Sequence, residues 1–332
     1  MKKRLFISMV FILAVLSVFS QTQARGKAIK YKLPHTAAVG GHFDMIANKF
    51  VDSLSKLSNG RISGTVYPAE QLGKESQVIQ SVQNGILEFT IIGHDPLAQF
   101  VPDTALLSLP FLFKDHNQAF TVLNSEVGET LNKELTKKKL LVLGWSNNGA
   151  RVYTNNTRQL ETPADFKGLK LRSPENRVNL AVTRSLGGIP VAISYGEVYT
   201  ALQQRTIDGQ ENAVINIYPS KLQEVQKYMS MTNHILSFVV IVASEDFYRS
   251  LPDEDKKLVE MAAKEAQDWH RGYIDKLTNE LIVKMKETGM QVYYPSNMKL
   301  FQDATKSVHS EYVGKTINKD LYEKTLRILG NN

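Results

Sequence analysis

Short apolar runs and helical periodicities alternate through the first part of the chain. Residues 28–33 and 61–67 have the alternation of strands, and residues 87–92 form a continuous apolar run typical of a buried strand. Helical spacing predicts one helix between the first two strands and another over residues 76–82. The apolar positions of the first helix are Phe43, Ile46, Phe50, Val51 and Leu54. This β-α-β-α-β order is typical of a parallel sheet covered by helices.

The same alternation continues to about residue 243. Residues 140–145, 169–172 and 234–243 are expected to form strands, and residues 177–186 and 196–204 helices. A chain of 332 residues exceeds what one core usually supports, so two lobes are expected. The sequence therefore predicts an α/β protein with two lobes, each a mixed, mostly parallel sheet flanked by helices.

A much longer helical pattern begins at Pro252 and continues to Gly289. Asp253, Glu254 and Asp255 follow the proline, where negative charge suits the positive end of the helix dipole. Apolar residues then recur at Leu258, Ala262, Ala266, Trp269, Tyr273, Leu277, Leu281 and Met285. About 35 helical residues would reach roughly 50 Å. A helix of that length either spans both lobes or is broken near Gly272.

The N-terminal residues have the pattern of a secretion signal. Residues 2–4 are basic, residues 5–19 are uncharged and almost wholly apolar, and small residues precede a cleavage point after Ala24. The apolar run is shorter than the ~20 residues that span a bilayer, which favours a cleaved signal peptide over an anchor. Residues 1–24 are therefore predicted to be a signal peptide, and the mature protein is expected in the periplasm.

The composition of the chain excludes several classes of function. The formal net charge is +7, of which three positive charges lie in the signal peptide, and the lysines near the C-terminus are mixed with acids. That distribution argues against a nucleic-acid partner. The absence of cysteine excludes disulfides, iron–sulfur clusters, thiolate zinc sites and cysteine nucleophiles. The histidines lack metal-ligand spacing, and Gly-x-Ser-x-Gly and glycine-rich phosphate loops are absent, so neither a cofactor nor an enzyme is predicted.

Candidate binding chemistry gathers between residues 145 and 218. Arg172 falls at the end of a predicted strand, just before Pro174, where the ligand crevice of an open α/β sheet lies. A guanidinium group there can hold a carboxylate through two parallel hydrogen bonds, a geometry that a lysine side chain cannot form. Arg151 follows another strand end and could reach the same crevice. The alternative is that each arginine pairs with a structural acid or lies in solvent.

Several motifs resemble the substrate-binding subunits of tripartite ATP-independent periplasmic (TRAP) transporters. They are Pro68-Ala-Glu-Gln-Leu-Gly73, Leu109-Pro-Phe-Leu-Phe113, Thr162-Pro-Ala-Asp-Phe-Lys-Gly-Leu-Lys-Leu-Arg-Ser-Pro174, Leu186-Gly187, Glu197-Val-Tyr-Thr-Ala-Leu-Gln203, Ile207-Asp-Gly-Gln-Glu-Asn212 and Glu224-Val-Gln-Lys-Tyr228. The resemblance covers about residues 28–328. It implies two lobes joined by crossing strands that close on a ligand around a hinge, with a long helix across both. Residues 25–148 with about 238–277 would form lobe I, and residues 149–237 with about 278–332 lobe II.

The resemblance also implies a set of ligand contacts. Arg172 would hold a substrate carboxylate, assisted by Arg151 and Asn212, with Tyr195 as a ring or hydroxyl contact. First-lobe contacts would come from two loops, through His35 and Thr36 after the first strand and through Gly93 and His94 after the third. The implied partners are a small-molecule carboxylate and the small and large integral membrane subunits of the transporter.

Departures from the family pattern bear on specificity. Ala213 stands where a proline often follows, and Gly93-His94 supplies no carboxylate, which argues against a sialic-acid-type ligand. Glu175 could instead accept hydrogen bonds from sugar hydroxyls, although it could simply be a charge at a helix start. A sugar acid such as a uronate or aldonate is the favoured ligand, and a C4-dicarboxylate or other organic acid is the alternative. A periplasmic hydrolase or lyase acting on a sugar acid, an adhesion protein and the binding protein of an ATP-driven importer remain open.

Overall fold

The structure of the protein, a computed structural model, describes residues 27–330, so the predicted signal peptide lies outside the described residues. The strands are β1 (Ile29–Pro34), β2 (Ile62–Tyr67), β3 (Phe89–Gly93), β4 (Leu140–Asn155), β5 (Lys170–Ser173), β6 (Ile189–Ala192), β7 (Gly209–Ala213), β8 (Tyr228–Ser230), β9 (Leu236–Ser244) and β10 (Gln291–Tyr293). The α-helices are α2 (His42–Leu57), α3 (Glu75–Gln83), α4 (His116–Leu123), α5 (Glu126–Lys137), α6 (Arg177–Ser185), α7 (Val198–Gln203), α8 (Val214–Ile217), α9 (Glu245–Ser250), α10 (Asp253–Glu287), α11 (Met298–Tyr312) and α12 (Lys319–Ile328). The predicted strands and helices are found within a few residues of their expected ends, except that the strand expected over residues 140–145 continues to Asn155.

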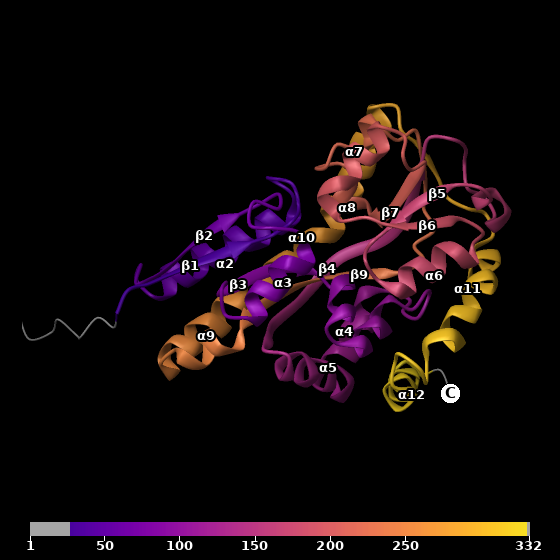
Figure 1. Cartoon of the computed structure of the whole chain (residues 1–332). Helices are drawn as coiled ribbons and strands as arrows, with labels where there is room; N and C mark the ends of the chain where they lie inside the picture. The colour runs from indigo at the N-terminus through magenta and orange to yellow at the C-terminus, as the bar shows by residue number, and fades with distance from the viewer. Residues whose placement is uncertain (1–26, 331–332) are drawn as a thin grey trace, which may run out of the picture.

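Strand β4 joins the two lobes. Its first part, from Leu140 to Ala150, pairs antiparallel with β9, which also pairs with β3. Its last part, from Arg151 to Asn155, pairs antiparallel with β7, and β8 pairs with its end. Sixteen residues of strand reach about 50 Å, so one continuous strand belongs to both lobes (Figure 1).

The remaining pairings complete a mixed α/β architecture. Strands β1 and β2 form a parallel pair next to β3. In the second lobe the strand order is β10-β8-β4-β7-β5-β6, with β5 parallel to both of its neighbours. The two-lobed α/β fold predicted from the sequence is confirmed. A register shift between Asn147 and Ala150 interrupts the β4–β9 ladder, and Gly149 supplies the positive φ of 82° that this bulge requires.

Helix α10 is continuous over 35 residues and spans both lobes. It packs against α2 and β4 along its first half and reaches α8 and β10 with its second half (Figure 1). Gly272 therefore lies inside the helix and does not break it. The expected apolar face is wrong at Trp269, which is 38% exposed and stacks on Tyr273, while His270 next to it is buried.

The acidic start of α10 also anchors the helix. Asp253, Glu254 and Asp255 lie in its first turn, as expected for interaction with the helix dipole. Asp255 in addition is buried and accepts a hydrogen bond from Arg61 Nη1 at 2.8 Å, as well as a second bond from Nη2. Because Arg61 directly precedes β2, this pair joins the helix to the first lobe.

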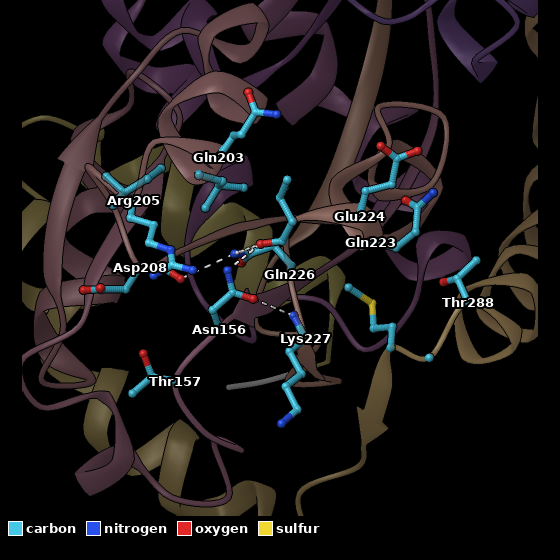
Figure 2. A pocket seen from close by; sticks show the side chains of 15 residues that line it. Asn156, Thr157, Gln203, Arg205, Asp208, Gln223, Glu224, Gln226, Lys227 and Thr288 are labelled. Carbon is cyan, nitrogen blue, oxygen red and sulfur yellow. Dashed lines mark hydrogen bonds between the residues drawn. The ribbon is translucent and has the colours of Figure 1, made fainter.

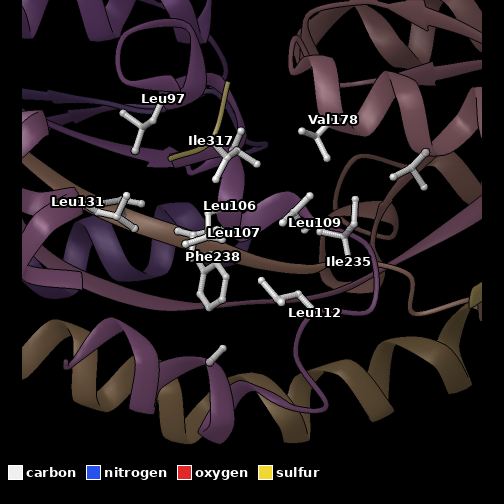
Figure 3. Close-up of a cluster of buried hydrophobic side chains, with 14 of the residues drawn as sticks. Leu97, Leu106, Leu107, Leu109, Leu112, Leu131, Val178, Ile235, Phe238 and Ile317 are labelled. Carbon is white, nitrogen blue, oxygen red and sulfur yellow. The ribbon is translucent and has the colours of Figure 1, made fainter. Parts of the chain in front are cut away.

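Three hydrophobic clusters fill the interior of the part of the chain that the structure describes. The largest runs through both lobes and gathers leucines from the segment between β3 and α4, together with Phe238, Val178 and Ile317 (Figure 3). A second cluster lies between α2, the strands of the first lobe and the first half of α10. A third lies between α7, α8, β7 and the second half of α10. The two lobes therefore share one hydrophobic core near the crossing strands, whereas the outer part of each lobe has a core of its own.

The C-terminal helices lie on different parts of the molecule. Helix α11 packs against α6 in the second lobe, whereas α12 packs against α4 and α5, which precede the crossing strand (Figure 1). The division of the sequence into lobe I and lobe II stays a prediction, with α12 the segment whose contacts lie with residues assigned to lobe I. Within residues 27–330, the helices lack a stretch apolar and long enough to cross a membrane.

Substitution of two glycines by alanine tests the packing around β7 in the second lobe and the regularity of helix α10. A Cβ at Gly209 would lie 2.1 Å from the carbonyl oxygen of Thr154 on β4, so Gly209→Ala is expected to destabilise the fold by about 1–3 kcal/mol. A Cβ at Gly272 would meet nothing within 4 Å, so Gly272→Ala is expected to stabilise α10 by about 0.5–1 kcal/mol. Urea unfolding of both variants measures the two changes. A destabilised Gly272→Ala variant would mean that α10 is not a regular helix at this position.

Candidate functional site

A cavity lies between the two lobes, at the ends of the crossing strands. Its volume is about 40 Å³, well below that of typical small-molecule sites, so the lobes would have to move apart to admit a ligand of that size. The first lobe contributes residues that follow β1 and β3 and the start of α2 and α3, and the second contributes residues of β4, β5, β7 and α8. Its lining consists of Thr36, Ala37, Phe43, Glu75, Gly93, Asp95, Pro96, Asn148, Arg151, Arg172, Pro174, Tyr195, Asn212 and Asn216.

Arg172 is a buried cation that pairs with no carboxylate among the described residues. It stands near the end of β5 and is 4% exposed. Its Nε donates a hydrogen bond to the carbonyl oxygen of Ile193 at 2.8 Å, which fixes the direction of the side chain. Burial, together with the nearby charge of Arg151, lowers the pKa of the Arg172 guanidinium. A guanidinium in this position gains most from an anion that enters the cavity.

Arg151 lies in the same cavity but already has two carboxylate partners. Its Nη1 donates to Asp95 at 3.2 Å, and its Nε and Nη2 both reach the carboxylate of Glu211. Burial opposes ionisation, but these two carboxylates prevail and raise the pKa of Arg151. The expectation that Arg151 lies near Arg172 is met, and so is the alternative that it pairs with structural acids.

Glu211 is the acid that holds Arg151 in place. It lies on β7 directly opposite Tyr153 of β4 and is fully buried. Burial alone would raise its pKa, but Arg151 and His234 lower the pKa of Glu211 to about 2. Glu211 therefore stays ionised, and Arg151 is compensated before any ligand arrives.

Tyr195 contributes its ring to the cavity. It begins a 3₁₀ turn (Tyr195–Glu197) ahead of α7, and the guanidinium carbon of Arg172 lies 5.8 Å from the centre of its ring. The hydroxyl donates to the carbonyl oxygen of Asn216 at 2.9 Å and lies 2.6 Å from Ser220 Oγ. The hydroxyl is therefore already bonded within the protein, and the ring, which lies beside the Arg172 guanidinium, contributes a cation–π contact.

Asn212 presents its amide nitrogen to the cavity. Its Oδ1 accepts from the backbone nitrogen of Ala213 at 2.8 Å and from Asn216 Nδ2 at 3.1 Å. Its Nδ2 donates to none of the described residues. Asn212 therefore supplies a hydrogen-bond donor beside the cation of Arg172.

The first lobe supplies carboxylates that the sequence analysis did not identify. Glu75, at the start of α3, lines the cavity, and its Oε1 accepts from the backbone nitrogen of Gly93 at 2.6 Å. Burial raises the pKa of Glu75 to about 7, with the charge of Asp95 contributing in the same direction. Gly93 and His94 themselves supply no carboxylate, as expected, but Glu75 brings one to the cavity from a helix, which removes the ground for arguing against a sialic-acid-type ligand. The position of Glu75 after the Gln-Leu-Gly motif was the available signal.

The predicted site residues of the first lobe divide into two groups. Thr36 lines the cavity, whereas His35 and His94 are fully buried behind it. His35 Nε2 lies 3.2 Å from Asp44, and His94 Nε2 lies 3.1 Å from Ser108 Oγ. The two histidines therefore support the loops that line the cavity and do not face it.

Glu175 is not among the residues that line the cavity, and its expected contact with ligand hydroxyls stays a prediction. Its side chain is exposed at the rim, and its backbone carbonyl accepts from Gln99 Nε2 at 3.0 Å. The chain turns at Pro174, which lines the cavity, and the next residue points outward. Asn176 then caps α6 through the backbone nitrogen of Val178.

A wider hollow at the outer edge of the second lobe has a different character (Figure 2). Its polar groups largely bond one another, as Asn156 does with the backbone of Val225 and Lys227. Its arginine, Arg205, is exposed and keeps its hydration. The smaller cavity between the lobes is the better candidate of the two, because it holds a buried cation without a carboxylate partner among the described residues, whereas the arginine of the wider hollow is exposed.

Comparison with known proteins agrees with this geometry. The model of the family "Bacterial extracellular solute-binding protein, family 7" matches residues 35–316. The 2,3-diketo-L-gulonate-binding periplasmic protein YiaO of Escherichia coli K12 is 32% identical over 298 residues, which is 90% of each chain. The sialic acid-binding periplasmic protein SiaP of Vibrio cholerae is 32% identical over 86% of this chain and 88% of its own. The crystal structure of the sugar acid binding protein of Advenella mimigardefordensis with galactonate superposes with a TM-score of 0.89, at 28% identity, covering 92% of this chain and 98% of that one.

Replacement of Arg172 tests the site directly. Arg172→Ala removes the unpaired cation, and loss of a buried charge-assisted contact typically weakens binding by ~2–5 kcal/mol, so a small carboxylate should bind at least about 30-fold more weakly. Arg172→Lys should also weaken binding, because an ammonium group cannot form the two parallel bonds. Isothermal titration calorimetry measures both. Unchanged affinity in Arg172→Ala would remove this residue from the site.

Proposed function

We propose that this chain, which belongs to the bacterial extracellular solute-binding proteins of family 7, captures a sugar acid such as a uronate or aldonate for a TRAP transporter. The observation that carries the proposal is the pair of arginines in the cavity. Arg151 is compensated by Glu211 and Asp95, whereas Arg172 is buried without a counter-ion. A single carboxylate completes this arrangement, with Asn212 Nδ2 as an additional donor beside it.

The opposite wall of the cavity favours a ligand with hydroxyl groups. Glu75 and Thr36 offer acceptor oxygens there, and Phe43 and Pro96 supply apolar surface. A sugar acid places hydroxyls against such acceptors. The second carboxylate of a C4-dicarboxylate would instead lie toward Glu75, where two negative groups would repel each other unless a proton were taken up. The similar proteins named above bind sugar acids: YiaO binds 2,3-diketo-L-gulonate, SiaP binds sialic acid, and the Advenella protein was crystallised with galactonate. These ligands support the same preference.

The remaining parts of the proposal follow from membership of the family. The mature protein acts in the periplasm after removal of residues 1–24 and delivers its ligand to the small and large integral membrane subunits of a TRAP transporter. Binding leaves the ligand chemically unchanged, with neither cofactor nor nucleic acid involved. Recovery of altered ligand would favour the alternative of a hydrolase or lyase.

A ligand screen tests the proposal. The mature chain is expected to gain thermal stability with D-glucuronate, D-galacturonate or D-galactonate and less with succinate, because a ligand that binds only the folded protein stabilises it by mass action. After long incubation, mass spectrometry of the bound acid should return the same compound. A larger shift with succinate would replace the sugar acid by the C4-dicarboxylate alternative, and no shift with any acid would contradict the proposal.

The raised pKa of Glu75 predicts that ligand binding depends on pH. Its pKa of about 7 lies above the ordinary value because of burial, and an incoming carboxylate would raise it further. Binding should therefore be accompanied by proton uptake, and affinity should fall as pH rises above about 7, since the ionised Glu75 then opposes the anion. Calorimetry in buffers of different ionisation enthalpy measures that uptake. Glu75→Gln should abolish the proton uptake, and an unaltered pH profile in this variant would place the titrating group elsewhere.

A further inference from the structure

A line of hydrogen bonds runs behind the cavity wall and ends on the ligand-facing amides. Ser146 Oγ lies 2.8 Å from His270 Nδ1, His270 Nε2 lies 3.1 Å from His42 Nδ1, and His42 Nε2 lies 3.0 Å from Asn216 Oδ1. Asn216 then donates to Asn212 at 3.1 Å and to Asn148 at 3.0 Å. All of these side chains are buried, and only the three asparagines reach the cavity.

The backbone of Ala213 fixes the direction of this line. Its N–H can only donate, so the Asn212 atom facing it is the oxygen, and the Asn216 atom that bonds to that same oxygen is the amide nitrogen. The remaining terminal atom of Asn216 is then an oxygen, which requires a proton on His42 Nε2. If His42 is neutral, its Nδ1 accepts from His270 Nε2–H, and the Nδ1 of His270 accepts from the Ser146 hydroxyl.

Both histidines are in a setting that keeps them neutral. His42 is 1% exposed and His270 is fully buried, and their rings lie against each other with centres 5.2 Å apart. Burial lowers the pKa of His42 to about 3, and burial with the proximity of His42 lowers that of His270 well below its ordinary value. Each ring therefore carries one proton, so every bond in the line has one donor and one acceptor. The Ser146 hydroxyl has a competing acceptor, the carbonyl oxygen of Gln267, at the longer distance of 3.4 Å.

The line also joins separate elements of the two lobes. His42 is the first residue of α2, His270 lies in the middle of α10, and Asn216 belongs to α8. Ser146 stands on β4 next to the bulge where that strand crosses between the lobes. We propose that His42 and His270 are positioning residues: they orient the Asn216 amide, whose Nδ2 joins the Ala213 N–H in holding Asn212 Oδ1, so that Asn212 Nδ2 points at the ligand carboxylate when α2, α8 and α10 are assembled. This inference rests on the proposed function, because it assigns a role in binding the same acid.

A double-mutant cycle on the mature chain tests the assignment. His42→Leu removes the donor to Asn216 and should weaken binding of the best sugar acid of the panel, D-glucuronate or D-galactonate, by about tenfold. His42→Gln should retain most of the affinity, since a glutamine amide N–H can replace Nε2–H. In an Asn212→Ala background the His42→Leu change should have little further effect, because the amide that it positions is gone.

Other outcomes separate positioning from plain stability. His309→Leu is the matched control: His309 also bonds a carbonyl, that of Pro110 at 2.8 Å, and the Tyr322 hydroxyl at 3.0 Å, but lies away from the cavity. It should lower the melting temperature and leave affinity unchanged. Equal losses from His42→Leu with and without Asn212 would contradict the assignment, and so would full affinity in His42→Leu.

A measurement on the unsubstituted protein keeps the inference testable even if His42→Leu does not fold. Nitrogen-15 NMR of the ligand-free chain should find both His42 and His270 protonated at Nε2 and bare at Nδ1. An Nδ1–H form of either ring would overturn the proposed direction. Absence of binding to every acid in the unsubstituted protein would instead contradict the proposed function, whereas the NMR result would still decide whether the line exists.

Discussion

The site depends on a difference between two neighbouring guanidinium groups: that of Arg151 is paired with carboxylates, whereas that of Arg172 is not. A buried cation without a partner is unfavourable, and two of them side by side are more so. Here Arg151 is compensated by Glu211 and Asp95, which leaves Arg172 as the one cation of the described cavity whose counter-charge must come from outside. The second lobe can be stable without ligand because Arg151 is satisfied internally, and it can be selective for an anion because Arg172 is not.

The strand architecture produces this inequality. Strand β4 carries Arg151 at the point where its pairing changes from β9 to β7, and β7 places Glu211 and Asn212 on adjacent residues that face opposite sides. Glu211 thus points toward Arg151 in the interior, while Asn212 faces the cavity beside Arg172 on the neighbouring strand β5. A slip of one residue in β7 would exchange the two roles, so the register of this central strand determines the binding chemistry.

Features that depend on one segment of the sequence could be predicted from local patterns. Strands β1, β2, β3, β5 and β9, the start of β4, the length of α10 and the place of Arg172 in β5 follow from periodicity and from the Gly-Leu-Lys-Leu-Arg run, whereas the short strands β6, β8 and β10 were not predicted. The partners of Arg151 could not be predicted, because Asp95 and Glu211 are distant in sequence and nothing local distinguishes a paired arginine from an unpaired one. Glu75 was missed for a related reason, since a charged residue opening a helix is ordinarily a dipole partner. The sequence also does not show that Pro174 lines the cavity while the side chain of Glu175, the next residue, is exposed.

Contacts across the mouth of the cleft are mostly exposed, and this limits what they contribute to closure. Lys74 bonds Glu197 at 2.7 Å, but both side chains are about half exposed, and such pairs contribute little. Glu70 accepts from Ser194 Oγ and from the backbone of Gly196, both at 3.0 Å, yet its backbone holds a positive φ of 59°, which offsets part of the gain. Among the described residues, buried polar contacts between the lobes include the Asp95–Arg151 pair, the Asn176 bonds to Asp95 and Ser108, and the bonds of Asn216 with His42 and Asn148. These polar contacts surround the ligand cavity, whereas those at the rim are exposed, and the apolar core that the lobes share near the crossing strands contributes to closure as well. An acid held by Arg172 therefore adds to the same group of contacts that brings the lobes together.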